Sequence, residues 1–195
     1  MLTVEQIQDY LPKYLSPREQ RELVSQLRDF ENGSYYTTLH GTEMLQGDGW
    51  GGIEIVNFAD GARDRIKGIL LSNSCDIAPS NERDFPPRIV FAPLVLLDAF
   101  VALLRTSTSL QPEQIGRKID AVRKQRVTSL FYLPRGGELD DDHIAILDDL
   151  HNIPLQRFLE AKRSKLFTLG QMGFYLFILK LSIHFCRFQE GVLRA

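Results

Sequence analysis

Three runs of the sequence decide its fold: IEIVNF (53–58), KGILLSNSCD (67–76) and RIVFAPL (88–94). Each run is rich in β-branched or aliphatic residues, and polar turns that contain glycine or proline separate them, a pattern that predicts consecutive β-strands. We therefore expect strands at 53–58, 67–73 and 88–94 that lie side by side. The glycine-rich segment GDGWGG (47–52) is a flexible entry to the first strand.

Helical and extended patterns alternate around these strands. Capping residues predict two N-terminal helices at about 4–12 and 17–31, and apolar periodicity predicts helices at 96–106 and 112–127. Strand patterns at 128–133 and 143–147 would complete a five-stranded α+β body. From Pro154 the chain reads as helical again, with a last helix that opens at Thr168.

The resulting expectation is an α+β protein built on a small, strongly bent β-sheet or barrel, with N-terminal, inserted and C-terminal helices. A chain of 195 residues fits a single domain, 1–195. Within it we expect three parts: an N-terminal helical extension at 1–31, a β-rich body with inserted helices at 50–150, and C-terminal helices at 154–190.

Composition excludes several classes of protein. A formal net charge of -2 argues against a protein that coats DNA, because any contact with nucleic acid must then use a local basic patch. Two distant cysteines, Cys75 and Cys186, favour the reducing cytoplasm over a disulfide framework. The N-terminal residues have no apolar signal core, and Lys180, His184 and Arg187 interrupt the apolar stretch 172–188, so we expect a cytoplasmic protein with no membrane partner.

The second strand ends in a cluster of small polar side chains, Ser72 to Asp76. A cysteine nucleophile at Cys75 would need a nearby base and a cationic environment that favours the thiolate, whereas the adjacent Asp76 brings a negative charge. The alternative is that Cys75 is a small structural residue and that Asp76 bonds to backbone amides of the loop. The four histidines are possible bases, but their spacing selects none of them: they are His40, His143, His151 and His184.

A basic helix face is the candidate nucleic-acid surface. Its cations lie around the predicted helix 112–127, and Lys67 would support them if it folds nearby. The candidate residues are Lys67, Arg117, Lys118, Arg123, Lys124 and Arg126. The alternative is an ordinary solvated helix face, since aromatic residues that would stack on bases are not interleaved with these cations.

Acidic residues gather near 138–149, where Asp140, Asp141 and Asp142 precede His143. Successive residues of an extended chain point to opposite sides, so such a run rarely closes on one ion, and no zinc or calcium spacing is present. We expect a solvated acidic loop, no metal and no cofactor.

The predicted strand segments IEIVNF, GARDRIKGILLSN and RIVFAPL resemble those of the MazF/PemK family of bacterial toxins, over about 45 of the 195 residues. The resemblance implies a small Src-homology-like barrel that cleaves RNA without a metal. It implies that Arg63 or Arg65 stabilises the transition-state phosphate, with Ser72 or Ser74 positioning it. The family's hydroxyl residue after the third strand falls near Val95, where no hydroxyl is present.

The pattern of Ser72, Cys75 and Asp76, followed by Ala92 and Pro93, is also similar to uncharacterised bacterial proteins of mobile and phage-defence gene neighbourhoods. Together the resemblances imply a component of a toxin–antitoxin or phage-defence module that acts mainly through protein or nucleic-acid binding. Its partner would be a protein encoded nearby or a second copy of the chain, and RNA is a further candidate. The alternatives are a metal-independent endoribonuclease of MazF/PemK type and a cysteine-dependent hydrolase, with Arg63, Arg65, Ser72, Cys75 and Asp76 as the candidate catalytic residues.

Overall fold

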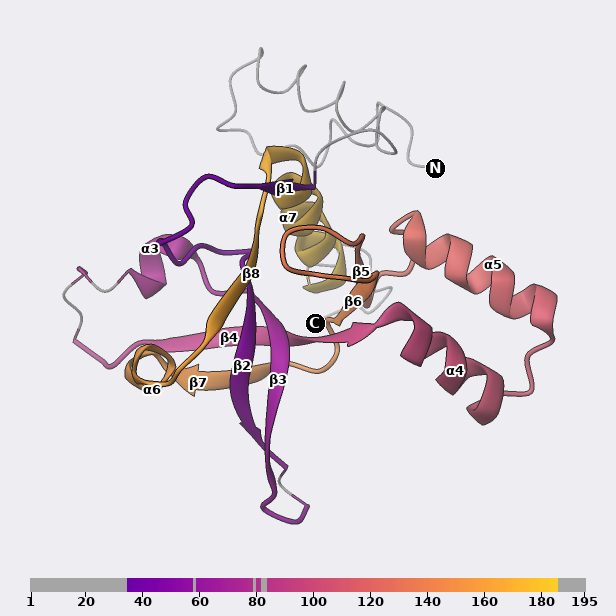
Figure 1. The fold of residues 1–195 in the computed structure, drawn as a ribbon, viewed down its shortest axis with the longest axis horizontal. Coiled ribbons are helices and arrows are strands. Elements are labelled where there is room, and N and C mark those ends of the chain that lie inside the picture. The colour runs from indigo at the N-terminus through magenta and orange to yellow at the C-terminus, as the bar shows by residue number, and fades with distance from the viewer. Residues whose placement is uncertain (1–34, 58, 79, 82–83, 186–195) are drawn as a thin grey trace, which may run out of the picture.

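A computed structural model describes residues 35–185 except 58, 79, 82 and 83. The predicted helices at 4–12 and 17–31 and the cysteine Cys186 lie outside the described residues. The described part is an α+β fold whose sheet curls strongly into an antiparallel half-barrel (Figure 1).

The three decisive runs form adjacent antiparallel strands, as predicted. These strands are β2 (Gly49–Val56), β3 (Arg63–Leu70) and β4 (Arg88–Leu96). In the register Glu54 lies opposite Arg65 and Ile69 lies opposite Ala92. Strand β3 ends before the polar cluster, because the chain turns there into a short helix, α3 (Ser74–Ile77), which the sequence did not predict.

The sheet has more strands than expected. Among the described residues it has eight strands in the order β1-β8-β2-β3-β4-β6-β5, with β7 also paired to β4. Every pairing is antiparallel, and the expected number of five strands is too low. The remaining strands are β1 (Tyr36–Thr37), β5 (Leu130–Leu133), β6 (His143–Ile146), β7 (His151–Pro154) and β8 (Ser164–Leu169).

Two features curl the sheet. Strand β4 pairs with β7 through its first half and with β6 through its second half, so one strand serves two neighbours. Strand β2 is irregular between Trp50 and Ile53, where Gly52 has a φ of +77°, a conformation that favours glycine. The curl brings β8 and β1 around to the same side as the C-terminal helix (Figure 1).

The inserted helices form where expected. They are α4 (Leu97–Ser107) and α5 (Pro112–Arg123), although α5 ends four residues before the predicted boundary because Gln125 takes a φ of +56°. The C-terminal region is not purely helical. It contains α6 (Leu155–Glu160), then strand β8, then α7 (Gln171–Phe185), and Thr168, the predicted helix cap, is buried within β8.

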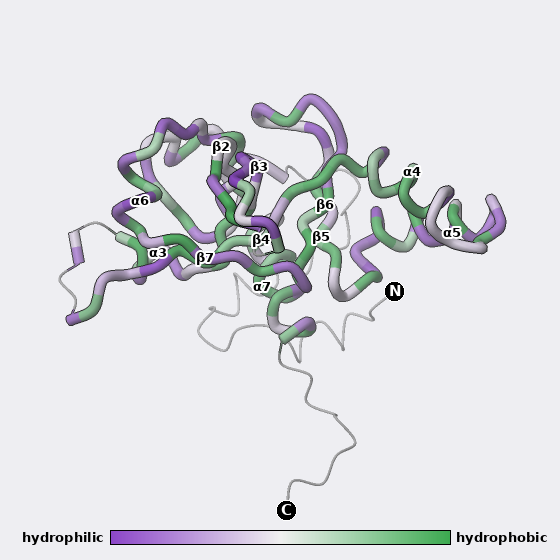
Figure 2. Tube along the Cα trace, turned by 90° about the horizontal axis from the view of Figure 1, so that it is seen from below, coloured by the Kyte–Doolittle hydropathy of each residue, from purple (hydrophilic) through white to green (hydrophobic). Residues whose placement is uncertain are grey.

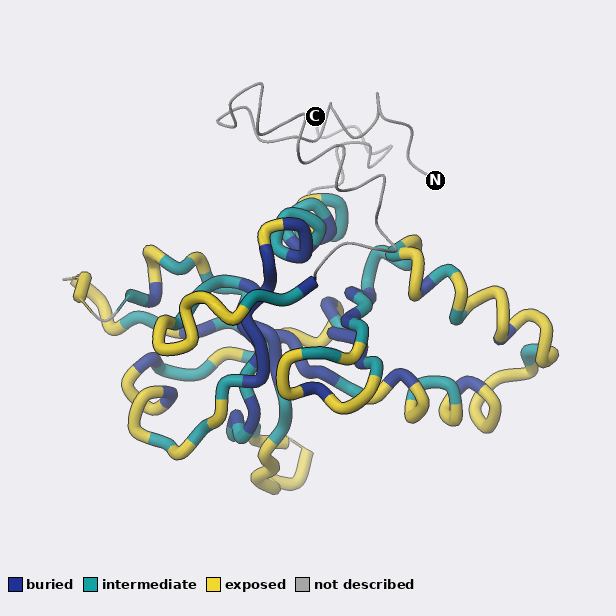
Figure 3. Tube along the Cα trace, turned by 45° about the horizontal axis from the view of Figure 1, so that its top comes forward, coloured by how far each residue is buried: buried dark blue, intermediate teal, exposed yellow. Residues whose placement is uncertain are grey.

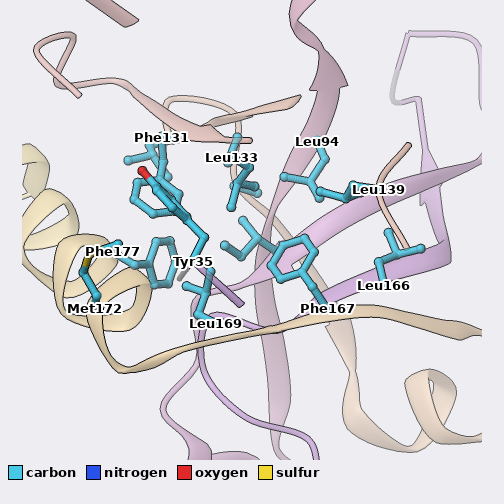
Figure 4. Close-up of a cluster of buried hydrophobic side chains, with 14 residues drawn as sticks. Tyr35, Leu94, Phe131, Leu133, Leu139, Leu166, Phe167, Leu169, Met172 and Phe177 are labelled. Atoms are coloured by element: carbon cyan, nitrogen blue, oxygen red, sulfur yellow. The ribbon is translucent and has the colours of Figure 1, made fainter. Parts of the chain in front are cut away.

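The main core lies between α7 and the concave face of the sheet (Figure 4). Phe177 of α7 packs against Phe131 of β5 with ring centroids 5.1 Å apart, and both side chains are fully buried. Burial of such aromatic side chains stabilises a fold by about 1.5–3 kcal/mol each. None of the helices in the described part of the chain is long and apolar enough to cross a membrane.

Candidate functional site

The two candidate arginines and the serine cluster lie toward opposite ends of β3. Arg63 is the first residue of the strand, whereas Ser72 lies two residues beyond its last. With a rise of about 3.3 Å per residue, the backbones of Arg65 and Ser72 are roughly 20 Å apart. Arg63 forms an ion pair with Glu54 at 3.2 Å, on an exposed part of the hairpin. The structure therefore does not gather the five candidate catalytic residues into one site.

The serines of the polar cluster hold neighbouring loops together. Ser72 Oγ accepts a hydrogen bond from the backbone N–H of Val90 at 2.8 Å, and Ser74 Oγ accepts one from the backbone N–H of Gln46 at 2.8 Å. The side chain of Asn73 caps α3 by accepting from the backbone N–H of Cys75. These contacts connect β3 to β4 and to the segment before β2.

The candidate nucleophile Cys75 is exposed on α3, beside the exposed Asp76. Each of the four histidines that the sequence offered as a base is engaged by another group. His40 pairs with Glu43, and His184 pairs with Asp148. His143 is buried with Nε2 3.4 Å from Lys67 Nζ, and the ring of His151 stacks on Phe91.

The basic residues of the 112–127 region do lie together, on a helical hairpin formed by α4 and α5 (Figure 1). Residues 97–126 carry six cations against three anions, a net charge of +3 in a chain whose net charge is -2. Lys67 is not part of this hairpin, because it lies on β3 beside His143. The hairpin is thus a local basic patch in a slightly acidic protein.

The ion pairs of the hairpin leave several of its cations without an acidic partner. Arg123 pairs with Asp142 at 3.3 Å and Lys124 with Asp120 at 2.9 Å. Arg117, Lys118 and Arg126 are exposed and form no ion pair with any residue that the structure describes. Cations of this kind are the side chains that neutralise phosphates in nucleic-acid complexes.

The hairpin projects from the sheet on a small apolar base (Figure 2). Leu97, Val122 and Ile144 are buried there, whereas most residues farther along both helices are exposed (Figure 3). The arrangement holds the helices against one end of the sheet and leaves their outer faces open to a large ligand.

Asp142 organises the base of the hairpin, a role that the sequence did not reveal. Its carboxylate accepts hydrogen bonds from Tyr132 Oη at 2.9 Å, from the backbone N–H of Arg135 at 3.1 Å and from Arg123 at 3.3 Å. Its carbonyl accepts from the N–H of Leu97 at the start of α4. Burial, together with the hydrogen bond to the Asp142 carboxylate, raises the pKa of Tyr132 to about 12.

The acidic segment does not converge into a metal site. No group of three or more histidine, cysteine, aspartate or glutamate side chains within the described ranges is arranged to hold an ion. Asp142 instead accepts hydrogen bonds from Tyr132 and Arg123.

No protein-family model matches the chain, and no curated protein is similar enough to it to count as a match.

A second feature lies at the end of the molecule away from the hairpin, around α3 and α6. A cavity of about 460 Å³ opens there between the segment before β2, α3 and the connection from α6 to β8. Ser74 of the polar cluster lines it, together with Trp50 and Arg163. Trp50 belongs to the glycine-rich entry to the first predicted strand, and no local pattern indicated Arg163.

Proposed function

We propose that this protein binds nucleic acid through the α4–α5 hairpin, as a component of a bacterial toxin–antitoxin or phage-defence module, and that RNA is the ligand. The observation that carries the proposal is the net charge of +3 on a projecting hairpin in a chain of net charge -2. Phosphate contacts of this kind are independent of sequence and sensitive to salt.

The placement of the unpaired cations supports this ligand. Arg117 and Lys118 lie in the middle of α5 and Arg126 lies in the turn after it, and all three are exposed to solvent, where a polyanion can reach them. Cations held on a rigid element lose little conformational freedom on binding. The hydrogen bonds of Asp142 and the buried Leu97, Val122 and Ile144 supply that rigidity.

The toxin–antitoxin or phage-defence setting, and with it a cytoplasmic location, rests on the resemblance of the three strands to the MazF/PemK family. The same resemblance implies RNA cleavage, which would need Arg65 and Ser72 at one phosphate. Because Arg65 lies on β3 and Ser72 lies beyond the far end of that strand, we favour binding over catalysis. A binding component needs only the exposed basic surface.

The test measures binding of the full chain to fluorescently labelled single-stranded RNA by anisotropy, in the presence of a chelator. We expect saturable binding that the triple substitution Arg117→Gln, Lys118→Gln and Arg126→Gln weakens at least tenfold. The matched control removes three exposed cations elsewhere, Arg88→Gln, Arg157→Gln and Lys162→Gln, and should leave binding within about twofold of the wild type.

Three results would count against the proposal. Absence of RNA binding at low salt would contradict the proposal. Equal weakening of RNA binding by the control triple variant would show that only overall charge matters. Cleavage of the RNA that Arg65→Ala abolishes would replace binding by the endoribonuclease alternative.

A further inference from the structure

The cavity around Trp50 and Arg163 has the size and lining of a small-molecule site. Its volume of about 460 Å³ falls within the range of about 300–1,000 Å³ that ligand pockets occupy. Met44, Leu45 and Leu159 give it apolar walls. It lies near α3 and α6, whereas the α4–α5 hairpin lies at the other end of the molecule (Figures 1 and 2).

Two N–H donors of the lining residues are buried without an acceptor. Trp50 Nε1 and Arg163 Nε are shielded from solvent, and neither has a hydrogen-bond partner among the described residues. A buried donor without a partner costs about 1–3 kcal/mol. Both atoms are donors, so the group that completes them must bring acceptor atoms. Because both are covered in the empty cavity, a ligand reaches them by displacing side chains of its wall.

The charge of the cavity also indicates a ligand that brings acceptor atoms. Arg163 has no carboxylate within ion-pair distance among the described residues, and its guanidinium stacks over the Phe158 ring at 4.3 Å. Its Nη1 donates to the carbonyl oxygens of Arg157 and Phe158, which hold the group in place. Arg163 is therefore a positioned cation without a directly paired carboxylate among the described residues.

The nearby carboxylates are already engaged by other cations. Glu43, which also lines the cavity, pairs with His40 at 2.7 Å, and Asp48 pairs with Lys165 at 2.9 Å. Burial lowers the pKa of Arg163, with Glu54 opposing this effect and Arg65 adding to it.

The aromatic rings of the wall define the rest of the ligand. Trp50 and Phe158 meet edge to face, with centroids 5.4 Å apart. Aromatic walls of this kind hold flat apolar groups. We propose that the cavity binds a small organic anion, in which a flat apolar ring lies against Trp50 and Phe158 and a carboxylate or phosphate group meets Arg163. This inference does not depend on nucleic-acid binding by the hairpin.

Trp50 is the only tryptophan of the chain, so its fluorescence reports directly on the cavity. The full chain is titrated with phenylacetate and with phenyl phosphate, and calorimetry provides an independent measure of binding. Acetate and inorganic phosphate test the anionic group alone, and phenylacetamide tests the ring without the charge. We expect a saturable change with at least one of the two ring-bearing anions, and binding at least tenfold weaker with phenylacetamide, acetate and inorganic phosphate.

Variants separate a specific site from general attraction of anions. Arg163→Gln should weaken binding of the anion at least tenfold, whereas Arg157→Gln, which removes a neighbouring exposed cation, should change it less than twofold. A preference for phenyl phosphate over phenylacetate identifies a phosphomonoester as the ligand class, and the opposite preference identifies a carboxylate.

The inference is overturned if neither ring-bearing anion binds, if phenylacetamide binds as well as phenylacetate, or if Arg163→Gln binds like the wild type. Arg163→Gln also removes hydrogen bonds to the end of α6, so its thermal melting is measured beside that of Arg157→Gln. If the variant fails to fold, the comparison of anion and amide on the wild-type chain still decides.

Discussion

Lys180 Nζ, in the middle of the apolar helix α7, donates hydrogen bonds to the carbonyl oxygens of Gln125 at 2.6 Å and of Val127 at 2.8 Å. These carbonyls lie just beyond α5, where Gln125 turns the chain with a positive φ. A buried lysine thus connects the C-terminal helix of the core to the base of the basic hairpin. In the sequence the same residue only argued against a membrane span.

The stability of the protein should increase with pH above about 8. Burial lowers the pKa of Lys180 from its ordinary value of 10.5 to about 8, so between these values the unfolded chain binds more protons than the folded one. Proton linkage then raises the free energy of unfolding with pH, by on the order of 2 kcal/mol up to pH 10. Urea denaturation at pH 7, 8, 9 and 10 measures the rise.

The rise should end near pH 10 because buried tyrosines oppose it there. Burial raises the pKa values of Tyr35 and Tyr36 well above the ordinary value of 10, so their ionisation favours the unfolded chain. Lys180→Met removes the titrating amine and should flatten the profile between pH 8 and 10. An unchanged profile in this variant would show that another group is responsible.

Breaking the buried pair of Asp48 and Lys165 should be strongly destabilising. Asp48 is fully buried, and Lys165 Nζ also donates to the carbonyls of His40 and Glu43, so the pair holds the segment before β2 against β8. Asp48→Asn leaves the largely buried ammonium group of Lys165 without its carboxylate partner. This loss should lower the free energy of unfolding by about 3–5 kcal/mol. Chemical denaturation measures the loss, with Asp120→Asn in the exposed pair with Lys124 as the control, expected below about 0.5 kcal/mol. A similar loss in both variants would contradict the role of burial.

Two glycine-to-alanine substitutions should change stability in opposite directions. Gly116 lies within α5 with no atom within 4 Å of its added Cβ, so Gly116→Ala should stabilise by about 0.5–1 kcal/mol. Gly137 has a φ of +60°, and a Cβ there would lie 2.6 Å from the carbonyl oxygen of Leu166, so Gly137→Ala should destabilise by more than about 2 kcal/mol. Thermal melting of the two variants compares them, and a lower melting temperature for Gly116→Ala would contradict the α5 packing described here.

The salt dependence of RNA binding should reveal the contacts of the hairpin. Each phosphate contact to a single strand contributes about 0.7 to the slope of log affinity against log salt. Removing Arg117, Lys118 and Arg126 should therefore reduce the slope by about 2. Anisotropy titrations between about 50 and 300 mM salt measure it, and a variant whose slope matches the wild type would place the phosphate contacts elsewhere.

Local pattern predicted the elements that a short window can define. The runs at 53–58, 67–73 and 88–94 alternate or concentrate apolar residues strongly enough to mark β2, β3 and β4 and their order as neighbours. Apolar periodicity from residue 112 onward marked α5. In each case the signal is carried by residues close together in the chain.

Strands that depend on distant partners were missed for the same reason. The segment Ser164–Leu169 was assigned to a helical region because of its helical neighbours, yet it forms β8, whose hydrogen bonds come from β1 and β2 more than 100 residues earlier. Strand β7 is four residues long and pairs with β4. A strand of this length has too few residues to show the alternation of apolar and polar side chains that marks a strand in the sequence.

The sequence by itself determined the α+β class, the three central strands and the basic character of the helix after residue 111, because periodicity and charge are properties of neighbouring residues. Only the tertiary structure decided that Arg65 and Ser72 lie apart, that Asp142 and Lys180 secure the hairpin, and that Trp50 and Arg163 share a cavity. Contacts of this second kind depend on how the sheet curls and on which buried groups find a partner. No local window contains that information.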